Sequence, residues 1–166
     1  MSPARATLAN LSSPYVQWYT RVSSGSYEAA LYAAGAVTHA VEDVLVRNRG
    51  RAFCAVRPPG HHAGPSKGEG FCLFNNVAIG ALHATAFRDT RVAIVDFDRH
   101  HGNGTQDIVE NANDSRLLFI SSFQEDCKYS KHQKEGGGSK STIVHAPIPH
   151  RSDYRQVSAE YAKKVL

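Results

Sequence analysis

Residues 94–105, IVDFDRHHGNGT, run from an apolar segment through alternating carboxylates and imidazoles into closely spaced glycines. The apolar run predicts a buried strand over residues 91–98, because short apolar segments bounded by turn residues are typical of strands in a covered sheet. Asp96, Asp98 and His100 then stand at its carboxyl end. Parallel sheets bind their ligands outside the carboxyl ends of their strands. The stretch therefore predicts a functional site where this strand ends.

Apolar runs and segments of helical spacing alternate along the rest of the chain. We predict strands over residues 52–56, 91–98, 116–122 and 142–148, and helices over residues 26–47, 73–87, 104–112 and 153–166. This alternation predicts an α/β fold with a parallel sheet flanked by helices. We expect residues 1–14 to form an irregular N-terminal segment and residues 124–140 to form a polar loop.

The composition is that of a soluble globular protein of 166 residues, with 42% hydrophobic and 20% charged residues. No window holds about 18 consecutive apolar residues, so we expect no membrane span. The N-terminus lacks the apolar core of a signal peptide, so we do not expect secretion. The net charge of +4 is scattered, without a basic block of the kind that follows a phosphate backbone. We therefore expect no direct binding of nucleic acid.

The cysteines give no sign of a disulfide framework. There are three, Cys54, Cys72 and Cys127, and no two are spaced as CxxC. An odd number without paired spacing argues against a cysteine-based zinc site and favours a reducing compartment. Cys54 and Cys72 lie in apolar stretches, where we expect them to act as small buried hydrophobes.

The Asp-x-Asp-x-His pattern suits a metal site. Alternate side chains of an extended backbone emerge on one side, so Asp98 and His100 point the same way. A carboxylate oxygen and an imidazole nitrogen suit zinc, and also Fe(II) or another borderline divalent ion. Asp96 has the same parity but lies deeper, which favours a role in orienting a neighbour. A helix cap and a tight turn at the glycines would also account for these residues.

A second cluster lies in RPPGHHAGPSKGEGF (57–71), whose prolines and glycines predict a loop of fixed shape. The adjacent His61 and His62 are candidates for a general base, because histidine titrates near neutral pH. Two histidines that are merely polar residues of a loop would give the same sequence pattern. Phe71 is placed either at the rim of a pocket or in the core.

Four motifs in the same order resemble the histone deacetylases. They are GSYEAALYAAGAV (25–37), RPPGHHAGP (57–65), GFCLFNNVAI (70–79) and DFDRHHGNGTQ (96–106). The PPGHHA and NN-containing motifs look more like the class II branch than class I. The resemblance implies an arginase/deacetylase-like three-layer fold. It also implies that residues 15–166 are the N-terminal half of the catalytic domain, and so a truncated domain.

The resemblance implies a role for each matching residue. Asp98 and His100 match two of three zinc ligands, His62 the general base, and His61 the neighbour that stabilises the transition state. Asp96 and Asn103 match the hydrogen-bond partners of the two histidines, and Gly70 and Phe71 belong to the wall of the substrate tunnel. Asp96, Asp98, His100 and Ser121 also match the positions that hold a potassium ion in the family.

Two parts of the family site have no match in this sequence. They are the third zinc ligand, an Asp, and the Tyr or His that stabilises the oxyanion. Asp107, Asp114, Asp126 and Asp153 are other carboxylates, but none stands in the matching context. Arg99 replaces an apolar residue inside the zinc motif, and a cation there is expected to weaken metal binding somewhat unless it points away into solvent.

These observations predict zinc-dependent hydrolysis of acetyl-lysine in histones or other proteins, with low activity for this chain alone. An amidohydrolase acting on acetylated polyamines would carry the same motifs. A non-catalytic truncated isoform, binding a corepressor complex, is the alternative of a different class. The resemblance suggests the nucleus, with the cytoplasm as the alternative.

Overall fold

A computed structural model describes residues 20–87, 89–126 and 142–164 of the chain. Three strands, β1 (Val92–Asp96), β2 (Leu117–Gln124) and β3 (Ile143–Ile148), form one parallel sheet in the order β1-β2-β3. The strands predicted over residues 91–98, 116–122 and 142–148 are therefore confirmed. Because all three run the same way, their carboxyl ends lie at one edge of the sheet.

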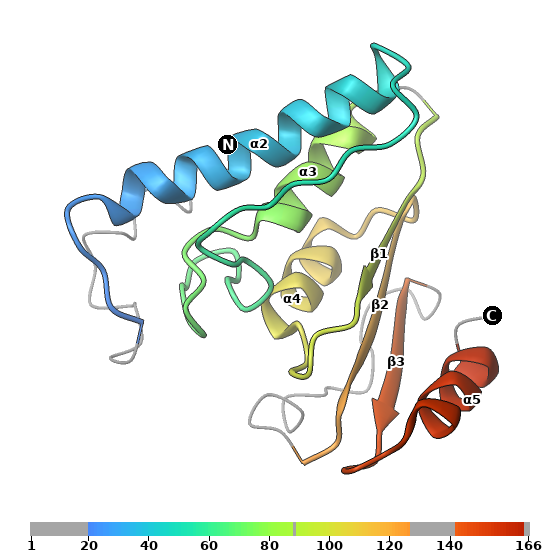
Figure 1. Cartoon of the computed structure of the whole chain (residues 1–166). Helices are drawn as coiled ribbons and strands as arrows, with labels where there is room; N and C mark the ends of the chain where they lie inside the picture. Colours follow the sequence, from blue (N-terminus) through green and yellow to red (C-terminus); the bar gives the residue numbers. More distant parts are fainter. Residues whose placement is uncertain (1–19, 88, 127–141, 165–166) are drawn as a thin grey trace.

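Helices cover both faces of this sheet. They are α2 (Ser26–Leu45), α3 (Asn76–Thr85), α4 (Asn103–Ala112) and α5 (Tyr154–Lys164), which confirms the four predicted helices. In Figure 1, α2, α3 and α4 lie on one side of the sheet and α5 lies on the other, beside β3. The architecture is thus an open three-layer α/β arrangement. No helix within the described ranges is long and apolar enough to span a membrane.

The core forms where α3 and α4 meet the sheet. Ile94 of β1 and Phe119 of β2 pack with Ala81 of α3 and Val109 of α4, and all four are buried. β2, between two neighbours, is buried along almost its whole length. β1 buries only Ile94, because among the described residues it has a neighbouring strand on one side alone.

The predicted strand over residues 52–56 is wrong: this segment has no strand pairing in the structure. An open cavity of about 970 Å³ separates it from β1, lined by Cys54 and Val56 on one side and by Val92 and Val95 on the other. Ladder hydrogen bonds cannot form across such a gap. Cys54 is accordingly half-buried, whereas Cys72 is buried as expected.

Several expectations fall outside the described residues. These concern the irregular segment 1–14, Cys127 and most of the polar loop 124–140.

Helices α2 and α3 cross at close range. A Cβ placed on Gly80 of α3 would lie 2.5 Å from Cγ1 of Val37 on α2. Around Gly35, in the middle of α2, a Cβ would meet nothing within 4 Å. Two helical glycines therefore differ in what an added methyl group contacts.

We predict opposite effects on stability for the same substitution at these two glycines. Gly80→Ala forces α2 and α3 apart and should lower the free energy of unfolding by about 1–3 kcal/mol. Gly35→Ala, the matched control, should raise it by about 0.5–1 kcal/mol through helix propensity. Urea denaturation followed by circular dichroism measures both. A Gly80→Ala protein as stable as the Gly35→Ala protein would contradict the close helix crossing.

Candidate functional site

The two histidine clusters meet at the carboxyl end of β1. The loop of residues 57–71 packs against the turn that leads from β1 into α4. A Cβ on Gly104, in the first turn of α4, would lie 2.5 Å from the backbone of His62 and Ala63. The backbone N–H of Thr105 donates to the carbonyl of His61 at 3.1 Å. Only a glycine at position 104 allows this backbone contact, which fixes the histidines relative to the strand end.

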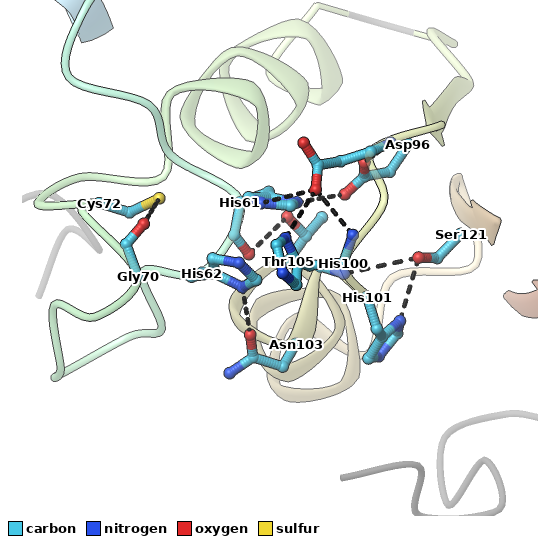
Figure 2. A network of polar contacts seen from close by, with 12 residues as sticks. His61, His62, Gly70, Cys72, Asp96, His100, His101, Asn103, Thr105 and Ser121 are labelled. Carbon is cyan, nitrogen blue, oxygen red and sulfur yellow. Dashed lines mark hydrogen bonds and ion pairs between the residues drawn. The ribbon is translucent and has the colours of Figure 1, made fainter. Parts of the chain in front are cut away.

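His61 is paired with Asp96, the last residue of β1. His61 Nδ1 lies 2.8 Å from Asp96 Oδ2 (Figure 2). Because a carboxylate only accepts, Nδ1 of His61 carries a proton. The other carboxylate oxygen, Asp96 Oδ1, accepts from the backbone N–H of Asp98 at 3.0 Å. Asp96 therefore holds both the imidazole and the turn that follows β1.

His62 is buried and paired with Asn103. Its Nδ1 lies 2.7 Å from Asn103 Oδ1, and its ring centre is 3.9 Å from that of His61. Burial, together with the neighbouring His61, lowers the pKa of His62 to about 4. The ring is thus neutral at neutral pH. Gly70, at φ +58°, passes so close to this ring that a Cβ would lie 2.2 Å from its Cδ2.

Asp98 and His100 are more exposed than the His61–Asp96 and His62–Asn103 pairs. Asp98 Oδ1 lies 3.3 Å from His100 Nδ1 and accepts from the His100 backbone N–H at 2.7 Å. Partial burial raises the pKa of Asp98, but the His100 backbone N–H and the nearby imidazoles outweigh it and lower that pKa. Asp98 is therefore an anionic oxygen donor beside an imidazole nitrogen.

The spacing of these two donors fits a zinc ion. Zinc–nitrogen and zinc–oxygen bonds of about 2.0–2.2 Å at tetrahedral angles put neighbouring ligand atoms about 3.3–3.5 Å apart. The residues that the structure describes include no group of three His, Cys, Asp or Glu side chains able to hold a metal ion. Asp114 is paired with Arg116, and Asp153 caps the backbone at Gln156. The described part of the site thus offers two ligands.

Arg99 does not lie among these donors. Its Nε donates to Gln124 Oε1 at 2.8 Å, at the end of β2. The exposed side chain is held against the neighbouring strand end.

Ser121 lies opposite Asp96 in the register of β1 and β2 and is fully buried. The buried His101 contacts it, with Nδ1 at 3.0 Å from Ser121 Oγ, and contacts Gln106 Oε1 through Nε2 at 2.8 Å. Gln106 Nε2 donates to Glu110, so its Oε1 is an acceptor and His101 Nε2 is the donor. Neutral His101 then accepts the Ser121 hydroxyl proton at Nδ1. Sequence reasoning gave His101 no role.

Phe71 lies at the surface rather than in the core. Its side chain is 64% exposed, its φ is +66°, and its backbone N–H donates to Thr20 Oγ1 at 3.2 Å. The expectation of a core position for this ring is therefore wrong, and a place at the rim of a pocket stays a prediction.

Sequence reasoning also gave no role to Glu69. It is a buried carboxylate whose Oε1 accepts from Asn103 Nδ2 at 2.6 Å. In the sequence it is one acidic residue between two glycines, which does not separate it from an exposed loop glutamate.

The chain belongs to the histone deacetylase domain family, whose model matches residues 4–166. Type-2 histone deacetylase 2 of Dictyostelium discoideum is 51% identical over 109 residues, covering 61% of this chain and 6% of that protein. The crystal structure of the HDA15 HD domain has a TM-score of 0.66 at 37% identity, covering 72% of this chain. That of acetylpolyamine aminohydrolase from Burkholderia pseudomallei has a TM-score of 0.69 at 32% identity, covering 83%.

The chain spans a minor part of these relatives. The match covers 35% of the HDA15 chain and 40% of the aminohydrolase chain. Both structural similarities agree with the expected fold.

We predict that acid destabilises the chain through its buried histidines. Burial, with the neighbouring His145, lowers the pKa of His101 to about 4, as for His62. In the unfolded chain a histidine becomes protonated near pH 6.5. In the folded protein His62 and His101 become protonated only near pH 4. The unfolded state binds more protons in this window, so the free energy of unfolding falls as the pH drops. Each of these two histidines contributes on the order of 2–3 kcal/mol to the free energy of unfolding at neutral pH.

Thermal unfolding between pH 7 and pH 5 measures this effect. His101→Gln should flatten the pH dependence, and the exposed His39→Gln should leave it unchanged. A midpoint that is independent of pH in the unsubstituted protein would contradict the burial of neutral imidazoles.

Proposed function

We propose that this chain supplies the N-terminal part of a zinc-dependent protein-lysine deacetylase site, which hydrolyses acetyl-lysine in histones or other proteins. One observation carries the proposal. The His61–Asp96 and His62–Asn103 pairs stand beside the Asp98–His100 donor pair at a single strand end. General-base and ligand side chains in one place suit hydrolysis of an amide.

Asp98 and His100 are the residues that would hold the zinc ion, with the third ligand supplied from outside the described residues. A bound zinc ion polarises an amide carbonyl and lowers the pKa of water. Asp96 and Ser121 offer oxygen donors of the kind that a hard cation such as potassium prefers. We propose them as part of a potassium site.

His62 is proposed as the general base. With Nδ1 bonded to Asn103, its Nε2 lone pair is the position that takes a proton from the attacking water. His61, held by Asp96, would help to stabilise the transition state and later the leaving amine. The proton that His62 takes from water would pass to that amine. The exposed ring of Phe71 would lie along the apolar stem of a lysine that acetylation has made neutral.

The second candidate is hydrolysis of acetylated polyamines. It is supported by the likeness to acetylpolyamine aminohydrolase, which has the higher TM-score of the two structures compared. Both substrates present the same amide, so the same histidines and donors would serve either. Corepressor binding and a nuclear or cytoplasmic location remain predictions from the family.

We predict weak, zinc-dependent release of acetate from an acetyl-lysine peptide by the chain. The rate should be low, because losing one oxyanion donor alone costs about 10²–10³ in rate, and the described residues offer only two metal ligands. Asp98→Ala should abolish turnover. Glu28→Ala, which removes an exposed carboxylate in the first turn of α2, should leave it unchanged.

Rates measured on the acetyl-lysine peptide and on an acetylated polyamine decide between the two candidate functions. Preference for an acetylated polyamine over the peptide would favour the second candidate. Turnover that survives Asp98→Ala would contradict the proposed metal ligand. No turnover of either substrate by folded protein would contradict catalysis by this chain, and would favour either a fragment of a longer deacetylase or a binding module.

A further inference from the structure

We propose that Glu69 is a positioning residue that fixes the proton of His62 on Nδ1, acting through the side-chain amide of Asn103. Its meaning for catalysis rests on the proposed function, in which His62 is the general base. The arrangement itself concerns only where one proton sits, and it can be measured without turnover.

The three side chains form a continuous chain of hydrogen bonds. Glu69 is 7% exposed and lies in the loop of residues 57–71. Its Oε1 accepts from Asn103 Nδ2 at 2.6 Å, and Asn103 Oδ1 lies 2.7 Å from His62 Nδ1. Its other oxygen, Oε2, lies 2.8 Å from Lys67 Nζ.

The carboxylate decides which end of the Asn103 amide faces the imidazole. A carboxylate can only accept hydrogen bonds, so the amide must turn its NH₂ group toward Glu69. Its carbonyl oxygen then faces His62 and can only accept. His62 Nδ1 must therefore be the donor, and Nε2 is left with the lone pair.

The opposite orientation of the amide would disable the base. With its NH₂ group toward His62, Asn103 would need a lone pair on Nδ1, and the proton of the neutral ring would move to Nε2. That nitrogen could no longer accept a proton from water. An asparagine alone has no preference between the two orientations, because its amide can present either end. Glu69 supplies the preference.

The packing around His62 keeps the ring in place for this hydrogen bond. The close approach of Gly70, where a Cβ would lie 2.2 Å from the ring, leaves little room for movement. Asn103 opens α4, whose start packs on the backbone of His62 through Gly104. Glu69 therefore selects the tautomer of a ring that other contacts already hold.

Lys67 contacts Glu69 at a different oxygen from Asn103. Its ammonium group contacts the Glu69 oxygen that Asn103 does not use, and its side chain is half-exposed. Removing it should leave the bond between Glu69 and Asn103 in place. Lys67→Met is thus a matched control that removes a neighbour of the carboxylate but not the amide contact.

The test is nitrogen NMR of the metal-free chain labelled with ¹⁵N in its histidines, at neutral pH. The His62 signals are those that disappear in His62→Gln. In the unsubstituted chain, Nδ1 should resonate as a protonated, pyrrole-type nitrogen and Nε2 as an unprotonated, pyridine-type nitrogen. Lys67→Met should give the same pattern.

Glu69→Gln should exchange the character of the two nitrogens in part or in full. Lys67 can only donate, so it draws the single oxygen of the glutamine side chain and leaves an NH₂ group toward Asn103. Asn103 then turns its oxygen to that group and its own NH₂ to His62. In Lys67→Met/Glu69→Gln neither amide has a fixed orientation, because the carboxylate and the ammonium group are both gone. The His62 signals should then show a mixture of the two tautomers.

Two results would overturn the proposal. One is a protonated Nε2 in the unsubstituted chain, and the other is a His62 pattern that Glu69→Gln leaves unchanged in folded protein. If Glu69→Gln fails to fold, the double variant decides, because it also lacks the carboxylate: a His62 pattern identical to that of Lys67→Met would contradict the proposal. A chain without turnover but with the expected tautomers would contradict catalysis by this chain alone and leave this inference standing. Turnover that survives Asp98→Ala would contradict the proposed function without touching the tautomer of His62.

Discussion

The close backbone contact between the loop of residues 57–71 and the start of α4 is the constraint on which the site depends. At Gly104 there is no room for a Cβ against His62 and Ala63, and at Gly60 a Cβ would lie 2.6 Å from the backbone nitrogen of Asn76. The loop is thus held against α4 on one side and α3 on the other. With the backbone so placed, the imidazoles reach Asp96 and Asn103 at hydrogen-bond distance.

Local sequence patterns were sufficient for most of the fold. Each confirmed helix has apolar residues at helical spacing, and each confirmed strand is an apolar run that finds a parallel neighbour. The failure at residues 52–56 has a physical cause. Local hydrophobicity reports that a segment can be a strand, whereas pairing depends on a neighbour elsewhere in the chain. Here β1 lies across a cavity, and the segment stays unpaired.

The site shows the same limit of local information. The spacing of Asp98 and His100 predicted neighbouring ligands, because alternate residues of an extended backbone share a side. The partners of His61 and His62 came from the family resemblance, and the structure brings the named residues together. The role of Glu69 was not predictable, because its partner Asn103 lies 34 positions away in the sequence. A charged loop residue has no local signal for such a contact.

The central claim is that Asp98 and His100 form one half of a zinc site, and a zinc titration followed by ¹⁵N NMR of the labelled histidines tests it most directly. The account predicts that zinc moves the His100 Nδ1 signal, the nitrogen 3.3 Å from Asp98 Oδ1, and leaves the buried His101 and His145 signals in place. Asp98→Ala should remove the response of His100. A zinc response centred on other histidines, or a His100 response that persists in Asp98→Ala, would contradict the account.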